Sequence, residues 1–265
     1  MNVFDGNTHL EKEHLSIRVR EPNKEEGGFD DGVLTHYATV QDVLSGMKKH
    51  SIQKSLVMPN TVTADKMDAK KSSEMIAKEI VGFKNLVGAA CVHPYSKSAV
   101  YDLEEGVLEN GLRALMLCPE RQGFEINDEA VWMLFERVEE LKVPVILYTQ
   151  WSKGSEDYLS MHSLFDVGSS FHINFILPHM GVGSDISALS EIADLKNVYL
   201  ETSHIQPRDV LRATGMFGPE RLIFGSDFSY NLYPKYELEK ILDLEIDKKD
   251  KEKILGKNLE GLLKW

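Results

Sequence analysis

The chain has 265 residues, and its 42 aspartates and glutamates outnumber its 30 lysines and arginines, giving a formal net charge of −12. An acidic chain without clustered basic residues lacks what binding to nucleic-acid phosphates or to an anionic membrane surface requires. The sequence also has no apolar run of the roughly 20 residues that a membrane span needs, and no leader-like start. We therefore expect a cytoplasmic protein with no nucleic-acid partner and no membrane partner.

Short apolar runs recur along the chain, and each is followed by polar residues and then by a segment of helical periodicity. The runs are rich in Val, Ile and Leu without strict alternation, as is typical of parallel strands covered on both faces. Their average spacing of about 33 residues fits one strand with its crossover helix. The runs lie at 2–5, 53–58, 86–92, 112–117, 143–148, 173–177, 198–201 and 221–224.

Helix signals fill the segments between these runs. Thr39 and Asp42 have the spacing of a capping box, and Pro207 suits the first turn of a helix. Strands alternating with helices in this way predict an α/β fold, a single-domain (β/α)8 TIM barrel that spans residues 1–265. An open doubly wound sheet is the structural rival before any motif is considered.

Two segments stand outside the repeat. Residues 11–38 hold many carboxylates and several glycines, and we find no apolar period there, so we expect a loop insertion after the first strand. This loop has two open interpretations, a solvated surface excursion or a cover over the substrate. Residues 247–265 place apolar side chains on one helical face, which predicts a C-terminal helix packed on the outside of the barrel.

Polar side chains collect at the ends of the predicted strands, where a (β/α)8 barrel carries its active site. Asn7 and His9 are two residues apart, so both side chains point the same way from an extended strand. Together with His179 and Asp227 they bring imidazoles and a carboxylate from three strands, and these groups are suitable ligands for Zn²⁺ or a similar ion. The whole set is Asp5, Asn7, His9, Asn60, His93, Glu120, Arg121, Tyr148, Gln150, His179, Glu201, His204 and Asp227.

Four segments together resemble the family-2 branch of the amidohydrolase superfamily. They are 4–10 (FDGNTHL), 177–183 (LPHMGVG), 197–203 (NVYLETS) and 221–228 (RLIFGSDF). The resemblance extends to 111–117, 141–147 and 254–258, so it covers nearly the whole chain. It implies a barrel enzyme related to decarboxylases, hydratases and hydrolases of cyclic or acidic small molecules, some of which use one divalent metal and some none.

The resemblance also carries residue roles onto this sequence, with two departures. The family's first-strand motif is Asp-x-His-x-His, and here Asn7 replaces the first metal-binding histidine. The fifth strand of the family usually ends in a metal-binding histidine, and here it ends in Tyr148. The implied cofactor is a divalent metal, zinc before others, or none at all, and the implied ligands are His9, Asn7, His179 and Asp227.

The same residues permit chemistry without a metal. Asp227 is positioned to activate a water while His179 shuttles the proton, so we assign both as catalytic. Tyr148 would donate a hydrogen bond to a developing oxyanion, and Arg121 would orient a substrate carboxylate. Glu201 and His204 have two open interpretations, pairing with each other or supplementing the metal set. The expected substrate-binding residues are Tyr148, Arg121, His93, Glu201 and His204.

We therefore expect a hydrolase of a small acidic or cyclic substrate, one that cleaves an amide, a lactone or a related C–N or C–O bond. The open alternatives are a decarboxylase or hydratase of the same family, or a barrel that has lost catalysis and only binds a ligand. Loss of two ligand histidines is the feature that favours the last of these. A small molecule is the expected partner, and because barrels of this family often pair, a homodimer is compatible with the resemblance.

Overall fold

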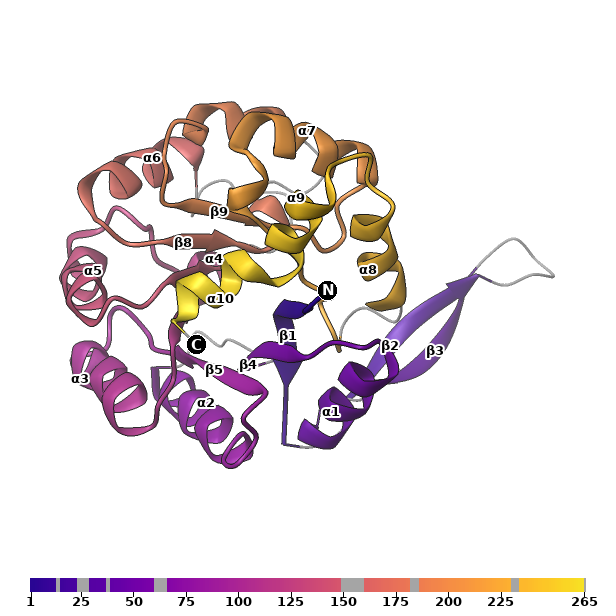
Figure 1. Ribbon diagram of the computed structural model, residues 1–265. Helices are drawn as coiled ribbons and strands as arrows, with labels where there is room; N and C mark the ends of the chain where they lie inside the picture. The colour runs from indigo at the N-terminus through magenta and orange to yellow at the C-terminus, as the bar shows by residue number, and fades with distance from the viewer. Residues whose placement is uncertain are drawn as a thin grey trace.

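The computed structural model describes residues 1–12, 15–22, 29–36, 39–59, 66–148, 160–181, 186–229 and 234–264. Eight parallel strands follow one another around a barrel in chain order, with helices outside them (Figure 1). The strand order shows no reversal, which confirms the predicted (β/α)8 barrel and excludes the doubly wound sheet. The strands are β1 (Phe4–Leu10), β4 (Lys54–Pro59), β5 (Leu86–Cys91), β6 (Ala114–Leu117), β7 (Val145–Leu147), β8 (Phe175–Leu177), β9 (Val198–Glu201) and β10 (Leu222–Ile223).

The barrel closes between its first and last strands. The backbone N–H of Gly6 donates to the carbonyl of Phe224 at 2.9 Å, and Thr8 forms a parallel bridge with Phe228. Position 6 requires glycine, because a Cβ there would lie 2.6 Å from the Ile223 side chain. The segment that follows the two-residue strand β10 is thereby held against β1.

The helices begin where their local signals indicate. Thr39 and Asp42 form the predicted capping box of α1, and Pro207 lies in the first turn of α7. No helix in the described part of the chain is long and apolar enough to cross a membrane. The outer helices are α1 (Val40–Lys49), α2 (Lys66–Glu79), α3 (Ala99–Glu104), α4 (Pro119–Gln122), α5 (Glu129–Leu141), α6 (Met161–Ser170), α7 (Pro207–Phe217) and α8 (Pro234–Leu242), with short turns η1 (Glu105–Glu109), η3 (Pro178–Gly181), η4 (Ile186–Ile192) and η5 (Pro219–Arg221).

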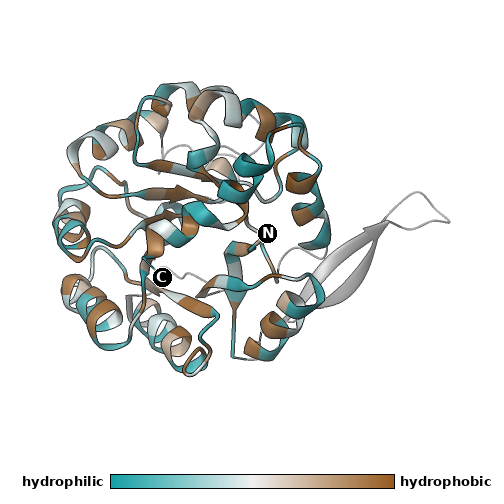
Figure 2. Ribbon diagram, in the orientation of Figure 1, coloured by the Kyte–Doolittle hydropathy of each residue, from teal (hydrophilic) through white to brown (hydrophobic). Residues whose placement is uncertain are grey.

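Buried apolar side chains form two layers, one inside the barrel and one between the strands and the helices. Figure 2 shows hydrophobic residues along the strands and alternating with hydrophilic ones around the outer helices. Alternate residues of a strand face the two layers, which is why every residue of β5 and β6 is buried. The first strand is longer than the predicted 2–5 and is buried throughout, so Asn7 and His9 lie inside it.

The predicted C-terminal helix is confirmed over α9 (Lys248–Glu252), the π-helical turn η6 (Lys253–Lys257) and α10 (Asn258–Leu263). Its expected place on the outside is wrong, because it crosses the end of the barrel where the strands begin (Figure 1). Leu259 and Leu263 pack with Phe4 in the interior layer, and the N–H of Phe224 donates to Ile254 O at 2.9 Å. This segment therefore closes the floor of the barrel, and function is left to the opposite end.

Leu259 provides a direct test of this floor. Its side chain is 1% exposed within the interior layer, so Leu259→Ala should lower the free energy of unfolding by about 2–5 kcal/mol through lost burial and a residual cavity. Chemical denaturation measures the change. Leu211→Ala on α7, where the side chain is 42% exposed, is the control and should cost no more than about 0.5 kcal/mol. Equal effects of the two changes would contradict the placement of the helix.

The segment 11–38 is not the irregular loop that we expect from its composition. It holds an antiparallel hairpin of β2 (Leu15–Pro22) and β3 (Phe29–His36), which projects from the barrel beside α1 (Figure 1). The signal for a strand is the apolar–polar alternation at 15–20 (LSIRVR), and the carboxylates and glycines that follow obscured it. A role in covering the substrate stays a prediction.

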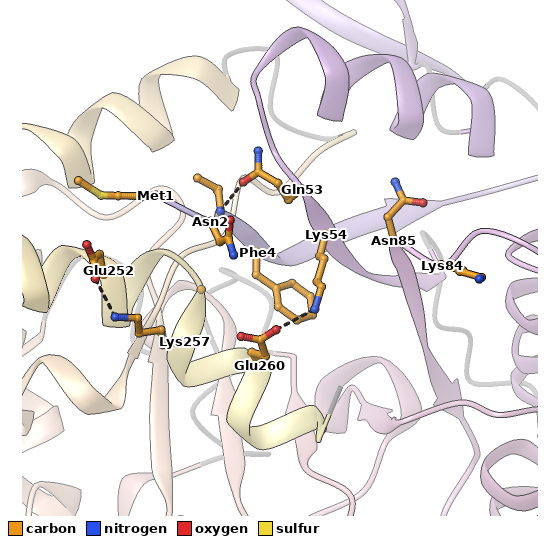
Figure 3. A pocket seen from close by; sticks show the side chains of 12 residues that line it. Met1, Asn2, Phe4, Gln53, Lys54, Lys84, Asn85, Glu252, Lys257 and Glu260 are labelled. Atoms are coloured by element: carbon orange, nitrogen blue, oxygen red, sulfur yellow. Dashed lines mark hydrogen bonds and ion pairs between the residues drawn. The ribbon is translucent and has the colours of Figure 1, made fainter.

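A cavity of about 690 Å³ lies at the floor of the barrel (Figure 3). Its lining comes from the starts of β1 and β4, the segment before β5 and the terminal helical segment. Lys54 pairs with Glu260 at 2.8 Å, and Lys257 pairs with Glu252 at 2.7 Å. The cavity is thus separate from the polar residues at the other end of the strands.

Candidate active site

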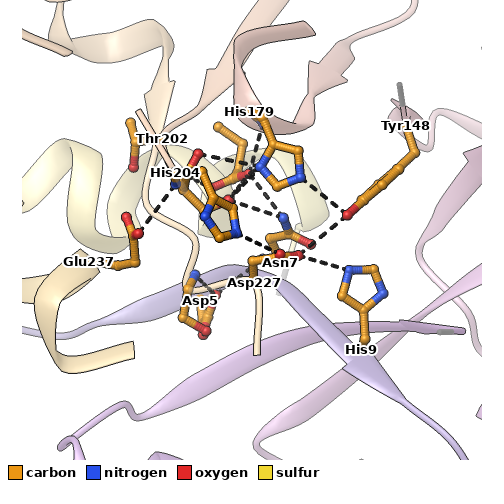
Figure 4. A network of polar contacts seen from close by, with 12 residues as sticks. Asp5, Asn7, His9, Tyr148, His179, Thr202, His204, Asp227 and Glu237 are labelled. Atoms are coloured by element: carbon orange, nitrogen blue, oxygen red, sulfur yellow. Dashed lines mark hydrogen bonds and ion pairs between the residues drawn. The ribbon is translucent and has the colours of Figure 1, made fainter. Parts of the chain in front are cut away.

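Several of the residues predicted at the strand ends gather around Asp227, as Figure 4 shows, whereas Asn60 and Gln150 lie outside the residues that the structure describes. Seven side chains form one hydrogen-bonded network with its carboxylate, directly or through neighbours. They are provided by strands and by the turns that directly follow strands, so the barrel frame fixes their spacing. The network members are Asn7 and His9 of β1, Tyr148 after β7, His179 after β8, Glu201, Ser203 and His204 at the end of β9, and Asp227 after β10.

The Asp227 carboxylate is buried and accepts hydrogen bonds at both oxygens. His9 Nε2 lies 3.1 Å and the Tyr148 hydroxyl 3.4 Å from Oδ1, and His204 Nε2 lies 2.8 Å from Oδ2. Burial alone would raise the pKa of Asp227, but the hydrogen bonds from His204 and His9, with the charge of His9, hold this pKa well below its ordinary value. The carboxylate is therefore ionised throughout the neutral pH range.

The tautomer of His9 follows from its two contacts. His9 Nδ1 lies 3.3 Å from the carbonyl oxygen of Pro59, which can only accept, so Nδ1 carries a proton. Nε2 faces the Asp227 oxygen at 3.1 Å, and a hydrogen bond there needs a second proton. His9 Nε2 and Asp227 Oδ1 therefore face each other as a buried histidine–carboxylate contact.

The tautomer of His179 is fixed through Ser203. The Ser203 hydroxyl donates to Glu201 Oε2 at 2.7 Å, so its lone pairs accept from His179 Nδ1 at 2.9 Å and from the Asn7 amide at 3.3 Å. With the proton of His179 on Nδ1, the Nε2 lone pair faces the Tyr148 hydroxyl at 3.2 Å. The relay thus leaves one basic nitrogen directed into the site.

Glu201 positions other residues, which corrects its assignment as a substrate-binding residue. Its side chain is 0% exposed, and its oxygens accept from the Asn7 amide at 3.0 Å and from the N–H of His179 at 3.1 Å. The hydroxyl and the N–H of Ser203 complete its partners at 2.7 and 2.5 Å. A carboxylate with four donors has no capacity left for a substrate.

Three residues of the network have a left-handed backbone. The φ angles are 53° at His179, 62° at His204 and 54° at Asp227. Such a conformation costs an L-residue about 1–2 kcal/mol, and strain of this kind gathers at functional sites where neighbouring contacts hold it in place. The turns after β8, β9 and β10 are therefore shaped for the direction in which these side chains point.

Asp5 is a further buried carboxylate, and it anchors the turn before Asp227. Its oxygens accept from the N–H of Ser226 at 2.9 Å, the hydroxyl of Ser226 at 2.5 Å and the N–H of Asn7 at 3.1 Å. Burial raises the pKa of Asp5 to about 7, with the charge of Glu201 adding to the rise and the hydrogen bonds opposing it. Its place in the first-strand motif is the sequence signal for this role.

Asp5 gives the protein a pH-dependent stability with a definite sign. Folding raises the pKa of Asp5 from 3.8 to about 7. The free energy of unfolding should therefore fall as the pH rises from about 4 to about 7, by up to about 4 kcal/mol. Asp5→Asn reproduces the protonated form and should flatten this slope in denaturation curves taken between pH 5 and pH 8. The exposed Asp243→Asn should keep the slope, and identical slopes in all three proteins would refute the assignment.

Two predicted substrate-binding residues lie apart from this network. His93 is 4% exposed after β5, where its Nδ1 accepts from the N–H of Tyr95 at 3.2 Å. Arg121 lies on α4, and within the described residues it makes no hydrogen bond or ion pair with the network. Their roles as substrate contacts stay predictions. Ser203 is the network member that residue-type reasoning did not select, because its function depends on where its side chain points.

The donor set does not fit a tightly held zinc ion, which takes three or more strong ligands. Asn7 offers only a neutral amide oxygen, and the Tyr148 phenol is engaged with His179 and Asp227. Within the described residues no group of three or more His, Cys, Asp or Glu side chains is arranged to hold a metal. His9, Asn7, His179 and Asp227 do come together, and in this structure they bond within the network, so zinc ligation by these four stays a prediction that the donor set does not favour.

A (β/α)8 barrel with ionisable residues joined at the carboxyl ends of its strands is the architecture of an enzyme. The model of the amidohydrolase family, described as "Amidohydrolase", matches residues 53–264, and the chain belongs to this family. It is thus an enzyme of a family whose members generally depend on a metal. No curated protein sequence gives a significant match to the chain.

Solved structures of the same fold carry several activities. A probable 2-pyrone-4,6-dicarboxylic acid hydrolase from Acinetobacter baumannii has a TM-score of 0.71 and 16% identity, with 100% of both chains covered. A dihydroxybenzoic acid decarboxylase from Polaromonas sp. JS666, with bound manganese, has a TM-score of 0.74 and 15% identity over 100% of this chain and 97% of that one. The 4-oxalomesaconate hydratase from Rhodopseudomonas palustris has a TM-score of 0.68 and 15% identity, with 85% of this chain and 80% of that one covered. At such identities they show a shared fold alone.

Proposed function

We propose that the chain is a hydrolase that uses His179 and Asp227 to activate a water for attack on the carbonyl carbon of a small acidic or cyclic substrate, such as a lactone or an amide. The observation that carries this proposal is the relay through Glu201 and Ser203, which presents the basic Nε2 of His179 beside an ionised carboxylate. General base catalysis needs a basic lone pair that is held in a fixed orientation.

The proposed reaction assigns separate roles to the two groups. Because the pKa of Asp227 is held low, its carboxylate is a weak base and serves to orient the water and to stabilise positive charge. His179 Nε2 receives the water's proton as the new C–O bond forms, and it returns the proton to the leaving oxygen or nitrogen as the old bond breaks. Tyr148 lies 3.2 Å from that nitrogen and would donate to the developing oxyanion.

Two further features support a water-based reaction on an acidic substrate. Asn7 Oδ1 is buried and has no hydrogen-bond partner among the described residues, and a bound water or a substrate hydroxyl would satisfy it. The Asp227 hydrogen bond raises the pKa of His204, whose side chain is 38% exposed. This histidine would offer positive charge to a substrate carboxylate at the mouth of the barrel. Among the related folds, the hydrolase named for a pyrone dicarboxylic acid has a substrate of this kind.

The proposed reaction does not use a metal, and we therefore expect activity to survive the removal of divalent metals. Removal of divalent metals by a chelator, followed by gel filtration, should change kcat/KM by less than about twofold, since water activation comes from the protein's own groups. Elemental analysis should find well under one equivalent of zinc or manganese. Loss of activity that returns with either metal would contradict the assignment and would restore the metal-dependent alternative.

The test of the function is a screen of lactones, amides and carboxylated aromatic acids with identification of the products. Hydrolysis of one class, abolished in Asp227→Asn, supports the proposal. Release of carbon dioxide or addition of water to a double bond would replace it with the decarboxylase or the hydratase. Saturable binding without any turnover would indicate a ligand-binding barrel. A homodimer and a cytoplasmic location stay predictions.

A further inference from the structure

We propose that Glu237 and Lys240 of α8 are positioning residues that hold His204 against Asp227, an inference that rests on the hydrolase function proposed above. Glu237 Oε1 accepts from the backbone N–H of His204 at 3.3 Å. Lys240 Nζ donates to the carbonyl of Thr202 at 2.7 Å and also to Glu237 Oε2. The two side chains thus hold the backbone of the turn after β9 at Thr202 and at His204, and Figure 4 shows Glu237 beside this turn.

Burial of this ion pair calls for a reason other than stability. The side chains of Lys240 and Glu237 are 0% and 4% exposed, so both charges have lost their water. The loss of hydration of a buried pair is only partly offset by its attraction, and apolar residues of similar size often replace such a pair without loss of stability. What apolar residues cannot supply is an acceptor for the His204 N–H and a donor for the Thr202 carbonyl.

The left-handed backbone of His204 provides the reason. Such a residue keeps its conformation only where its surroundings hold it, and the network has three of them. At each one, a buried carboxylate accepts a backbone N–H of the residue or of its neighbour. The pairs are Glu201 with His179 N at 3.1 Å, Asp5 with Ser226 N at 2.9 Å, and Glu237 with His204 N at 3.3 Å.

Glu237 of α8 therefore supports the turn at His204 as Glu201 and Asp5 support the turns at His179 and Asp227. The His204 ring reaches Asp227 Oδ2 at 2.8 Å only from the backbone conformation that Glu237 supports. Release of the turn would swing Nε2 away and leave one Asp227 oxygen without its partner. Asp227 would then be held less firmly for its role in orienting the water.

The matched test compares Glu237→Gln/Lys240→Met with Glu237→Leu/Lys240→Met. Both double variants remove the two charges together, so neither leaves a buried charge unpaired. They differ in the side-chain amide, whose oxygen can accept from the His204 N–H. Glu237→Ala/Lys240→Met replaces the second protein if leucine is not accommodated, and near-ultraviolet circular dichroism checks the fold.

The glutamine variant should keep kcat within about threefold of the parent, whereas the leucine variant should lose about tenfold to a hundredfold in kcat, with a rise in KM because the released His204 also leaves the substrate carboxylate. Adding His204→Ala to the leucine variant should cause no further loss, because both changes remove the same contact. The control is Glu239→Leu/Lys235→Met, which removes an exposed ion pair of 3.3 Å on the same helix and should leave kcat unchanged. Equal kcat in the glutamine and leucine variants would overturn the inference.

A second readout needs no substrate. The ring nitrogen resonances of His204, identified by their loss in His204→Ala, should shift toward those of a free histidine in the leucine variant and stay in place in the glutamine variant. Unchanged resonances in both would show that the pair serves only to attach α8. If no substrate in the screen is turned over, the proposed function fails while this spectrum still decides the positioning role.

Discussion

Asp227→Asn is expected to reduce kcat/KM by about a hundredfold to ten-thousandfold, the range that positioned acid–base groups contribute. The amide cannot carry the negative charge that pairs with His9 and His204, and it offers one acceptor where the carboxylate offers two. With the charge removed, the imidazolium that forms at His179 during water attack also loses its stabilising neighbour. The measurement is steady-state hydrolysis of the substrate found in the screen.

Asp243→Asn is the control for this change, since it removes an exposed carboxylate of the same type. The folded fraction of both variants is checked by denaturation, because a buried and paired carboxylate also contributes to stability. Activity of Asp227→Asn within about threefold of the parent protein would remove Asp227 from the chemistry.

His179→Gly is expected to produce a loss of similar size, about a hundredfold to ten-thousandfold in kcat, because it removes the basic nitrogen. The substitution suits the backbone, since φ is 53° at this position and glycine adopts that region without strain. The backbone N–H that Glu201 accepts is kept. A loss of activity can therefore be attributed to the imidazole rather than to the turn.

Rescue by added imidazole tests the role of the His179 ring directly. The free base should restore part of the activity of His179→Gly, because it can occupy the space of the missing ring and accept the proton from water. It should not restore Asp227→Asn or stimulate the parent protein. Full activity of His179→Gly without imidazole would assign the base to another group.

The sequence supports prediction of the barrel because each strand and helix has a local signal. Val- and Leu-rich runs at regular spacing, the capping box at Thr39 and the proline at 207 all act within a few residues. The hairpin at 15–36 was not predicted, because its short alternating stretch adjoins a region rich in carboxylates and glycines. Strand periodicity over six residues is a weak signal next to such a composition.

The sequence predicts which residues form the active site better than it predicts the hydrogen bonds that join them. His9, His179, His204 and Asp227 stand at strand ends, and barrel topology alone brings such positions together. The direction of each hydrogen bond is a three-dimensional property that no spacing encodes. Glu201 is the clearest case, since its partner Asn7 is 194 residues away in the chain.

Two positions show how a substitution changes the chemistry that a fold supports. Asn7 stands at a metal-ligand position of the family motif, and its amide donates to Glu201 and Ser203 instead. Tyr148 stands at another, and its hydroxyl joins His179 to Asp227. Together they join a set of expected ligands into one hydrogen-bonded network around Asp227.

The central claim is that water attacks the substrate's carbonyl and that His179 accepts the proton. The most direct test is turnover of the substrate in water enriched in the heavy oxygen isotope, followed by mass spectrometry of the product. The account predicts one heavy oxygen in the newly formed carboxylate and no carbon dioxide. Release of carbon dioxide with no heavy oxygen in the organic product would contradict it.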